Sequence, residues 1–170
     1  MPYEIRFANQ TDEATLQGIF LESDMDLAGE IEEHIVISRG DTVIGGGMLT
    51  QTDLDLFHLI VFAISEHERT HGLGRLLLDR LLQQPWDFCR DGSMPDGSSY
   101  RVTTVAKGKS AGFYGRLGFL PCDFSDLAAP FAGQCNDCPE AADCHPEAMC
   151  CNCTIAGADA HSNSEECCHE

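Results

Sequence analysis

The pattern of hydrophobic and polar positions along the chain predicts strands that alternate with helices. Runs in which apolar and polar residues alternate are typical of half-buried strands, whereas apolar residues three or four apart are typical of helices. The nearly continuous apolar run 54–65 predicts a central strand that is buried on both faces. The predicted elements are, in chain order, strand 3–8, a helix through 12–20, strands 34–39 and 42–50, strand 54–65, helix 72–84, strand 101–106, helix 110–117 and strand 119–124.

Other stretches fit this pattern less well. The acidic stretch 23–33 fits a short helix or a loop. Gly45-Gly46-Gly47, inside a predicted strand, indicates a bulge or a place where another chain or a ligand approaches the backbone. From about residue 128 onward no periodicity persists. We therefore expect an α/β (α+β) domain over residues 1–127 and an irregular, acidic, cysteine-rich tail over 128–170 that is partly disordered.

The composition narrows the classes of partner. The 170 residues suffice for one domain with a short appendage, and no apolar run approaches the roughly 20 residues of a membrane helix. The first residues lack the basic and apolar segments of a signal peptide, so we expect a cytoplasmic location. The formal charge of −18, from 28 acidic and 10 basic residues, argues against nucleic-acid and anionic-membrane partners. The sequence leaves a monomer and a homodimer equally open.

The junction between the predicted strand 54–65 and the helix after it has the chemistry of a pyrophosphate site. Gly72 and Gly74 let backbone N–H groups point outward, and the helix N-terminus adds partial positive charge. Arg69 and Arg75 flank the two glycines. The loop lacks the Gly-Lys-Ser/Thr ending of a P-loop. It also does not match the Gly-x-Gly-x-x-Gly pattern of dinucleotide-binding proteins. An ordinary strand-to-helix turn is the alternative interpretation.

This junction and a second motif together resemble the GNAT superfamily of acyl-CoA-dependent N-acetyltransferases. Arg69-x-x-Gly72-x-Gly74 is similar to the first signature of that superfamily, Arg/Gln-x-x-Gly-x-Gly/Ala. Phe113-Tyr114-Gly-Arg-Leu-Gly118-Phe119 is similar to its second signature, and the resemblance covers roughly residues 3–127. The resemblance implies a mixed central sheet flanked by helices, with acetyl-CoA as the co-substrate. It also implies direct transfer of the acetyl group to a primary amine of a small molecule or a peptide.

The resemblance assigns roles to the residues of both motifs. Backbone amides of the glycine loop would hold the CoA pyrophosphate, the strand before the loop would pair with the pantetheine arm, and Tyr114 would protonate the leaving thiolate. Lys107 and Ser110 stand where the family often has Asn and Ala, and a lysine there suits the CoA phosphates. The implied CoA-binding residues are Phe62, Ala63, Ile64, Arg69, Thr70, His71, Gly72, Leu73, Gly74, Arg75, Lys107 and Ser110.

The position at which the family often has the residue that accepts the amine proton holds a different residue in this chain. The histone-acetyltransferase branch has a Glu at the position of His58, and an imidazole can also accept a proton near neutral pH. His58 is therefore the first candidate base, and Glu66 in the loop is an alternative. A hydrogen-bonded core histidine and a solvated glutamate are the structural interpretations of these residues. The departure also leaves open a catalytically inactive CoA-binding module or a metal- or redox-sensing module.

Eight of the ten cysteines lie between Cys135 and Cys168. Cys135-x2-Cys138 places two sulfurs on one turn, which is half of a tetrahedral zinc site, and an iron–sulfur cluster fits the same thiolates. In a chain without a signal peptide, closely spaced thiols favour metal binding. Disulfide bonds and an unligated thiol segment are the two alternatives. The candidate ligands are Cys135, Cys138, Cys144, Cys150 and Cys151.

Overall fold

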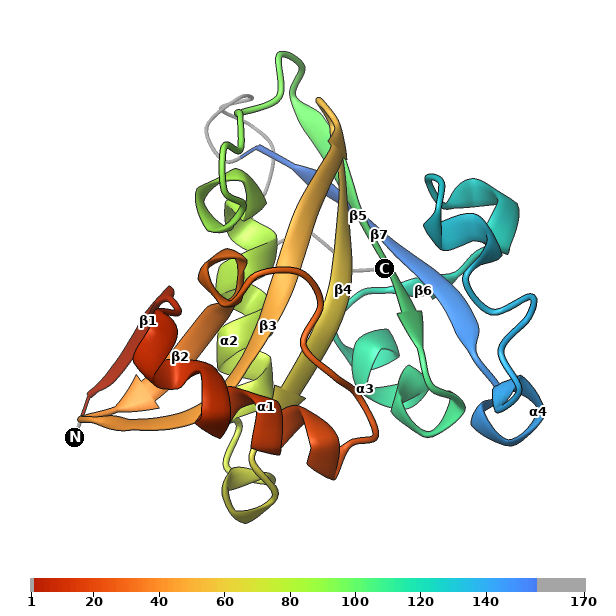
Figure 1. The fold of residues 1–170 in the computed structure, drawn as a ribbon. Coiled ribbons are helices and arrows are strands. Elements are labelled where there is room, and N and C mark those ends of the chain that lie inside the picture. Colours follow the sequence, from red (N-terminus) through yellow and green to blue (C-terminus); the bar gives the residue numbers. More distant parts are fainter. Residues whose placement is uncertain (1, 156–170) are drawn as a thin grey trace. The chain divides into compact units, whose positions relative to one another are not determined.

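The computed structural model describes residues 2–155 of the chain, which form two compact units. The first unit contains residues 2–51 and 59–93, and the second contains residues 52–58 and 94–155. Seven strands follow one another in the order β1-β2-β3-β4-β5-β7-β6 (Figure 1). The strands are β1 Tyr3–Phe7, β2 Ile35–Arg39, β3 Thr42–Asp53, β4 Leu56–Ile64, β5 Ser99–Ala106, β6 Leu120–Pro121 and β7 Glu147–Thr154. The helices are α1 Glu13–Glu22, α2 Leu73–Gln83, α3 Ala111–Arg116 and α4 Ala141–Cys144.

The expected class, a mixed sheet flanked by helices, is confirmed. The β1–β2, β2–β3, β5–β7 and β6–β7 pairs are all antiparallel. Among the described residues, no helix is long and apolar enough to cross a membrane. The predicted boundary between residues 127 and 128 stays a prediction.

Two local predictions need correction, and the structure decides a third that the sequence left open. The predicted strand 119–124 shrinks to Leu120–Pro121, because the chain turns there into a short 3-10 helix at Phe124–Asp126. The acidic stretch 23–33 is a loop that ends in one 3-10 turn, Ile31–Glu33. The stretch after residue 128 is not wholly irregular, because it contains α4 and the eight-residue strand β7.

Helices α1 and α2 cover opposite faces of the strands in the first unit (Figure 1). Leu16, Ile19 and Phe20 of α1 are buried in one hydrophobic cluster with strand residues that include Val36 and Val61. The leucines of α2 that point to the other face are also buried, namely Leu73, Leu77, Leu78, Leu81 and Leu82. The apolar run of β4 is buried for this reason, as its sequence predicts.

The triple glycine of β3 lies where neighbouring strands come very close. A Cβ on Gly45 would lie 2.9 Å from the carbonyl oxygen of Ala63, and a Cβ on Gly47 would lie 2.7 Å from that of Val61. A Cβ on Gly46 would collide with the carbonyl oxygen of Ile35. The register of β2 and β3 also shifts by one residue just before these glycines, so the predicted bulge is confirmed.

The second unit is built on the pairing of β7 along the whole length of β5. Tyr100 lies opposite Cys153, Val102 opposite Cys151 and Thr104 opposite Met149. Because side chains alternate along a strand, these residues share one face, and Thr103 points to the other. β6 adds to the outer side of β7, with Leu120 opposite Cys150.

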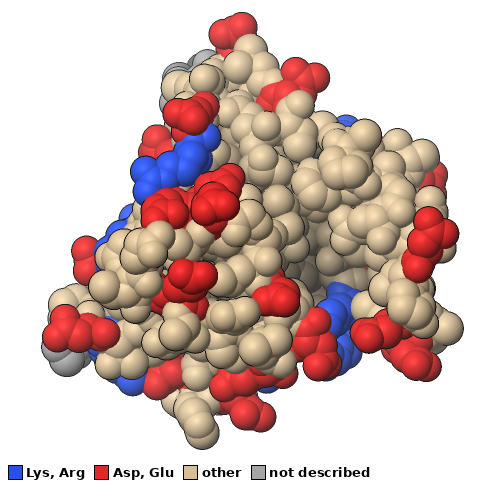
Figure 2. Space-filling view, viewed as in Figure 1, with Lys and Arg blue, Asp and Glu red and all other residues tan. Residues whose placement is uncertain are grey.

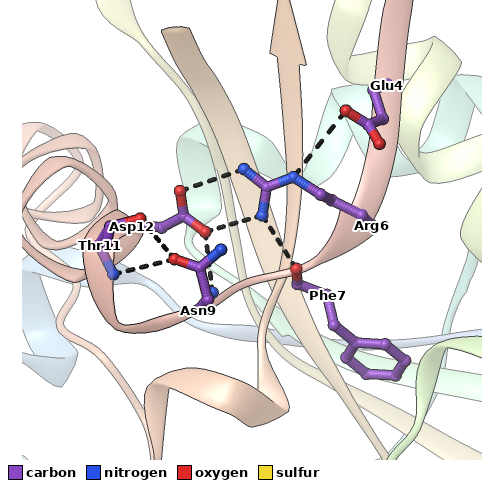
Figure 3. A network of polar contacts seen from close by, with 6 residues as sticks. All are labelled: Glu4, Arg6, Phe7, Asn9, Thr11 and Asp12. Atoms are coloured by element: carbon purple, nitrogen blue, oxygen red, sulfur yellow. Dashed lines mark hydrogen bonds and ion pairs between the residues drawn. The ribbon is translucent and has the colours of Figure 1, made fainter. Parts of the chain in front are cut away.

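A partly buried ion pair fixes the start of α1 in the first unit (Figure 3). The guanidinium of Arg6 donates to both carboxylate oxygens of Asp12, at 2.8 and 3.2 Å, and to the carbonyl of Phe7. Asp12 also accepts the backbone N–H of Asn9 at 2.8 Å, in a capping box with the Asn9 side chain. The hydrogen bond from Arg6 lowers the pKa of Asp12, so folding favours the carboxylate form.

The substitution Gly46→Ala tests the close approach of β3 to its neighbours. We expect a loss of roughly 1–3 kcal/mol in the free energy of unfolding, because the new methyl group meets the Ile35 backbone and the Leu16 side chain. Chemical denaturation measures this loss. In Gly18→Ala, where nothing lies within 4 Å, the same change should stabilise by about 0.5–1 kcal/mol through helix propensity. Equal stabilities of Gly46→Ala and wild type would contradict the packing described.

The substitution Asp12→Asn tests the ion pair, with a defined dependence on pH. The carboxylate contributes stability above its unfolded pKa of about 3.9, and this contribution is lost as pH falls through the lower folded pKa. Denaturation at neutral pH should therefore show a loss of roughly 1–3 kcal/mol that shrinks below about pH 4. Asp79→Asn is the control, because Asp79 and Arg75 are exposed and 3.8 Å apart, and should cost less than about 0.5 kcal/mol. A pH-independent loss for Asp12→Asn would refute the charge-based account.

Candidate active site

The glycine loop of the first unit leads from β4 into α2. The 3-10 helix Glu66–Glu68 follows β4, and Thr70 and Gly72 then adopt left-handed backbone conformations with φ of 73° and 77°. Gly72 precedes the first residue of α2 and makes no side-chain cap, and a Cβ there would meet nothing within 4 Å. The first N–H groups of α2 therefore have no capping side chain at Gly72, which is the property that an anion-binding helix start needs.

Arg69 braces this loop. Its Nε donates to the carbonyl oxygen of Ile64 at 3.0 Å, and its Nη2 donates to Ser23 Oγ at 3.0 Å. The guanidinium thus ties the loop to the end of β4 and to the end of α1. Its hydrogen bonds give Arg69 a structural role in shaping the loop, and the backbone amides remain the groups suited to a pyrophosphate.

The neighbouring charges of the loop are already paired. Glu68 accepts two hydrogen bonds from Arg39, at 2.7 and 3.1 Å, and this contact lowers the pKa of Glu68. His71 Nδ1 lies 3.8 Å from the same carboxylate, and Arg75 lies 3.8 Å from Asp79. Glu66 is exposed, and its backbone N–H donates to Glu22 at 2.9 Å.

The remaining predicted residues of the first unit are at the end of β4 and at the start of α2. Ala63 and Ile64 are buried and Phe62 is half-buried, because β3 packs closely beside them at its glycines. Leu73 is 3% exposed and anchors α2 in the core, so only its backbone is available to a ligand. Gly74 follows it within the first turn of the helix.

Tyr114 lies in α3 of the second unit, inside its own motif. Its ring makes edge contacts with Phe113 and Phe119, at centroid distances of 5.2 and 5.3 Å. The Phe119 backbone N–H also donates to the Tyr114 carbonyl at 3.1 Å. The Tyr114 side chain is hydrogen-bonded to Thr104, and burial raises the pKa of Tyr114, so the phenol keeps its proton at neutral pH.

His58 is buried in the part of β4 that belongs to the second unit. Its Nδ1 lies 2.8 Å from Thr103 Oγ1, and that hydroxyl donates to the carbonyl oxygen of Phe57 at 3.3 Å. Because the hydroxyl has one proton, these bonds assign the His58 proton to Nδ1 and leave the lone pair on Nε2. The ring of Phe131 stacks on the imidazole, with centroids 3.9 Å apart and planes at 15°. Burial lowers the pKa of His58 to about 4.

The two polar side chains that hold Tyr114 and His58 are consecutive residues of β5. Thr104 contacts Tyr114 and Thr103 contacts His58. Since consecutive side chains of a strand point to opposite faces, the tyrosine and the histidine lie on opposite faces of β5. The structure therefore gives each of them its own surroundings, and the two side chains do not form one hydrogen-bonded pair.

Lys107 precedes the 3-10 turn Gly108–Ser110, which connects β5 to α3, and Ser110 is the last residue of that turn. The Ser110 N–H donates to the Lys107 carbonyl at 2.7 Å. A Cβ on Gly108 would lie 3.0 Å from both the Cβ and the carbonyl oxygen of His145. The end of α4 therefore packs directly on this turn.

The predicted metal ligands do not assemble into a metal site. Within residues 2–155, no group of three or more His, Cys, Asp or Glu side chains is placed to hold a metal ion. Cys151 is disulfide-bonded, so its sulfur is not the thiolate that a zinc or iron–sulfur site requires. The other four candidates, Cys135, Cys138, Cys144 and Cys150, are free thiols. Cys167, Cys168 and His169 lie outside the described residues.

Sequence reasoning missed Thr103, Thr104 and Phe131. A pair of threonines between two valines of a strand is a weak signal for buried hydroxyls with polar partners. Phe131 lies after residue 128, where the sequence has no periodic pattern of apolar residues, and no local feature of the sequence links it to His58.

The comparisons with known proteins agree with this geometry. The model of the family described as "Acetyltransferase (GNAT) family" matches residues 4–119. Comparison with curated protein sequences gives no match.

Several solved structures have a similar fold. N-acetylglutamate synthase from Neisseria gonorrhoeae, complexed with coenzyme A and N-acetyl-glutamate, is 15% identical with a TM-score of 0.69. The match covers 88% of this chain and 35% of the synthase, so the chain spans about a third of the length of that protein. Rv2747 from Mycobacterium tuberculosis, in complex with CoA, is 18% identical with a TM-score of 0.64, and the match covers 86% and 97% of the two chains. The ribosomal-protein-S18-alanine N-acetyltransferase from Escherichia coli is 15% identical with a TM-score of 0.59, over 95% and 99%.

The substitution Phe131→Ala tests the environment of His58. Without the stacked ring, water reaches the imidazole and favours its charged form, so we expect the pKa of His58 to rise from about 4 toward 6.5. An NMR titration of the imidazole resonances measures the shift. Phe124→Ala, which removes a ring from the same segment but not from the stack, should leave the titration unchanged. An unaltered His58 pKa in Phe131→Ala would show that the stack does not keep the ring dry.

Proposed function

Because the chain belongs to the acetyltransferase (GNAT) family, we propose that it transfers the acetyl group of acetyl-CoA directly to a primary amine. The observation that carries this proposal is the buried Tyr114, whose hydroxyl is held by Thr104 and keeps its proton at neutral pH. A group in this state can give a proton to a departing thiolate. Acyl transfer from a thioester needs such a donor where the thiolate forms.

The glycine loop supplies what the diphosphate of CoA requires. The amides at the uncapped start of α2 offer hydrogen bonds and the positive end of the helix dipole. The loop keeps its shape through the bonds of Arg69 to Ile64 and Ser23, so its amides are preorganised. In our proposal, the pantetheine arm pairs with the backbone of Phe62, Ala63 and Ile64, as an added strand would. Lys107 and Ser110 would contact the cofactor from the turn before α3.

The proposed reaction moves one acetyl group and two protons. The amine nitrogen attacks the thioester carbonyl carbon and forms a C–N bond, and the C–S bond then breaks. Tyr114 gives its proton to the sulfur, and solvent restores that proton. The nitrogen loses its extra proton to a base. Catalysis of each proton transfer by a positioned group contributes typically about 10²–10⁴-fold.

His58 is the base in this proposal. Its depressed pKa makes it a weak base, but it also keeps the imidazole neutral, with a lone pair on Nε2, at every pH well above 4. The proton on nitrogen in the tetrahedral adduct is more acidic than the proton of a free ammonium, so a weak base suffices. Because His58 and Tyr114 lie on opposite faces of β5, Tyr114 would act at the sulfur directly and His58 would take the amine proton through water. Glu66, which is exposed in the loop, is the alternative base and would act through water.

The acceptor amine that we propose is cationic before it loses its proton. The formal charge of the chain is −18, and Asp and Glu side chains are spread over the face seen in Figure 2, with few Lys and Arg among them. Such a surface attracts cations over a range set by the ionic strength. A polyamine, a lysine side chain and a peptide N-terminus are the acceptors that fit.

The substitution Tyr114→Phe tests the proposed acid. We expect kcat to fall by roughly 10²–10⁴-fold, because the thiolate must leave without its proton donor, while the affinity for CoA stays unchanged. The assay follows free CoA by chromatography, with acetyl-CoA and a panel of a polyamine, a lysine derivative and a short peptide. Chromatography avoids thiol reagents, which would react with the ten cysteines of the chain.

Tyr100→Phe is the matched control for this experiment. Tyr100 is 3% exposed and lies on the same face of β5 as Thr104, so its change removes an equivalent buried hydroxyl away from the motif. We expect its kcat to stay close to that of wild type. Binding of CoA with no Tyr114-dependent release from any amine of the panel would count against the transferase proposal.

A further inference from the structure

Cys122 and Cys150 are free thiols on neighbouring segments of the second unit. Leu120 of β6 lies opposite Cys150 of β7, and just beyond β6 the Cys122 N–H donates to the Ala148 carbonyl at 2.9 Å. Residues two apart on a strand share a face, and so do residues that lie opposite each other. The register therefore places both cysteines on one face of these strands.

The two thiols are in contact and partly accessible. Their side chains are hydrogen-bonded to each other, and each residue is half-buried. Among the other free cysteines of the second unit, Cys153 is buried, Cys138 is exposed, and Cys135 and Cys144 are half-buried. A small thiol reagent can thus reach the Cys122–Cys150 pair, and each sulfur has the other as its neighbour.

The pair has a built-in asymmetry. Burial, followed by the neighbouring Cys150, raises the pKa of Cys122 to about 12, so Cys122 keeps its proton and can donate it in the hydrogen bond. Either sulfur becomes the nucleophilic form of a cysteine once it loses its proton, and the other sulfur is then its nearest thiol. Asp126 opposes negative charge at Cys122, and the guanidinium of Arg101 favours it.

The same register connects the pair to β5. Cys150 lies directly opposite Thr103, the residue that holds His58. The ionisable groups near this face are Arg101 on β5, Cys150 on β7, and Cys122 and Asp126 after β6. Burial lowers the pKa of His58, and the proton transfers proposed above use neither cysteine of the pair.

We propose that Cys122 and Cys150 form a redox-active dithiol site that is oxidised by low-molecular-weight disulfides such as oxidised glutathione. The Cys150 thiolate attacks one sulfur of the reagent, forms a mixed disulfide and releases one glutathione thiolate, which takes up the proton that Cys150 lost. Cys122 then attacks the Cys150 sulfur of the mixed disulfide and releases the second glutathione with the Cys122 proton. In total, the two protein thiols lose two protons and two electrons, and the reagent is reduced to two thiols. The product is a disulfide that links the end of β6 to β7.

The test uses the full chain, reduced and then exposed to oxidised glutathione. After the remaining thiols are alkylated, the chain is digested without reductant and analysed by mass spectrometry. No Lys or Arg follows Arg116, so the digestion uses proteases that cut before Asp123 and after Glu147. We expect wild type to give a cross-linked pair of peptides that contains Cys122 and Cys150 and lacks two hydrogens.

Two serine variants separate the steps of the exchange. Cys122→Ser removes the resolving thiol, so Cys150 should retain one glutathionyl group. Cys150→Ser removes the attacking thiol, so neither the cross-link nor an adduct on Cys122 should form. Cys89→Ser, which changes a buried thiol of the first unit, should give the wild-type cross-link.

Two outcomes would overturn the proposal. One is a wild-type chain in which Cys138 takes up glutathione but Cys122 and Cys150 are not linked. The other is a cross-link from Cys122 that persists in Cys150→Ser, because Cys151 or Cys153 would then be its partner. Neither outcome depends on acetyl transfer, so the result leaves the proposed function to be tested on its own.

Discussion

The alternation of side chains along β5 is the constraint on which the chemistry of the second unit depends. Thr103 and Thr104 are neighbours in the sequence, but they hold His58 on one face and Tyr114 on the other. A shift of one residue in the pairing of β5 would exchange the two faces and remove both contacts. The register of β5 with β7 therefore matters beyond its contribution to stability, because it fixes which titratable group meets which hydroxyl.

Residues after the family match supply much of this environment. The match ends at residue 119, yet β7 pairs with all of β5, Phe131 stacks on His58, and His145 packs on the turn at Gly108. The described residues after 119 are thus part of the structure around the candidate residues. These contacts show that the segment after residue 119 does more than carry thiols, because it packs around the candidate residues.

How much the sequence predicts depends on how local each signal is. The glycine loop and the Tyr114 motif are short and contiguous, so their positions at the start of α2 and within α3 follow from the sequence. β7 is not recognisable from the sequence, because its buried positions are Ala148, Met149, Cys151 and Cys153, and cysteines so close together look like metal ligands rather than buried strand residues. The stack of Phe131 on His58 joins residues 73 positions apart, and only the fold can bring them together. The bulge at the triple glycine was predictable, since a run of residues without Cβ atoms has few other uses in a strand.

Burial favours the neutral form of both proposed proton carriers. It raises the pKa of the Tyr114 phenol and lowers the pKa of the His58 imidazole, because each desolvation disfavours the charged form. The result is an acid that holds its proton and a base that has none, which is the starting state that the transfer of an acetyl group to an amine requires. Charges then appear only as the C–N bond forms and the C–S bond breaks. A solvated tyrosine and histidine would have pKa values closer together, and the histidine would be partly protonated below pH 7. The hydrophobic surroundings of His58, which at first suggest a purely structural role, therefore keep the proposed base neutral, whereas the Tyr114 phenol would carry its proton at neutral pH in water as well.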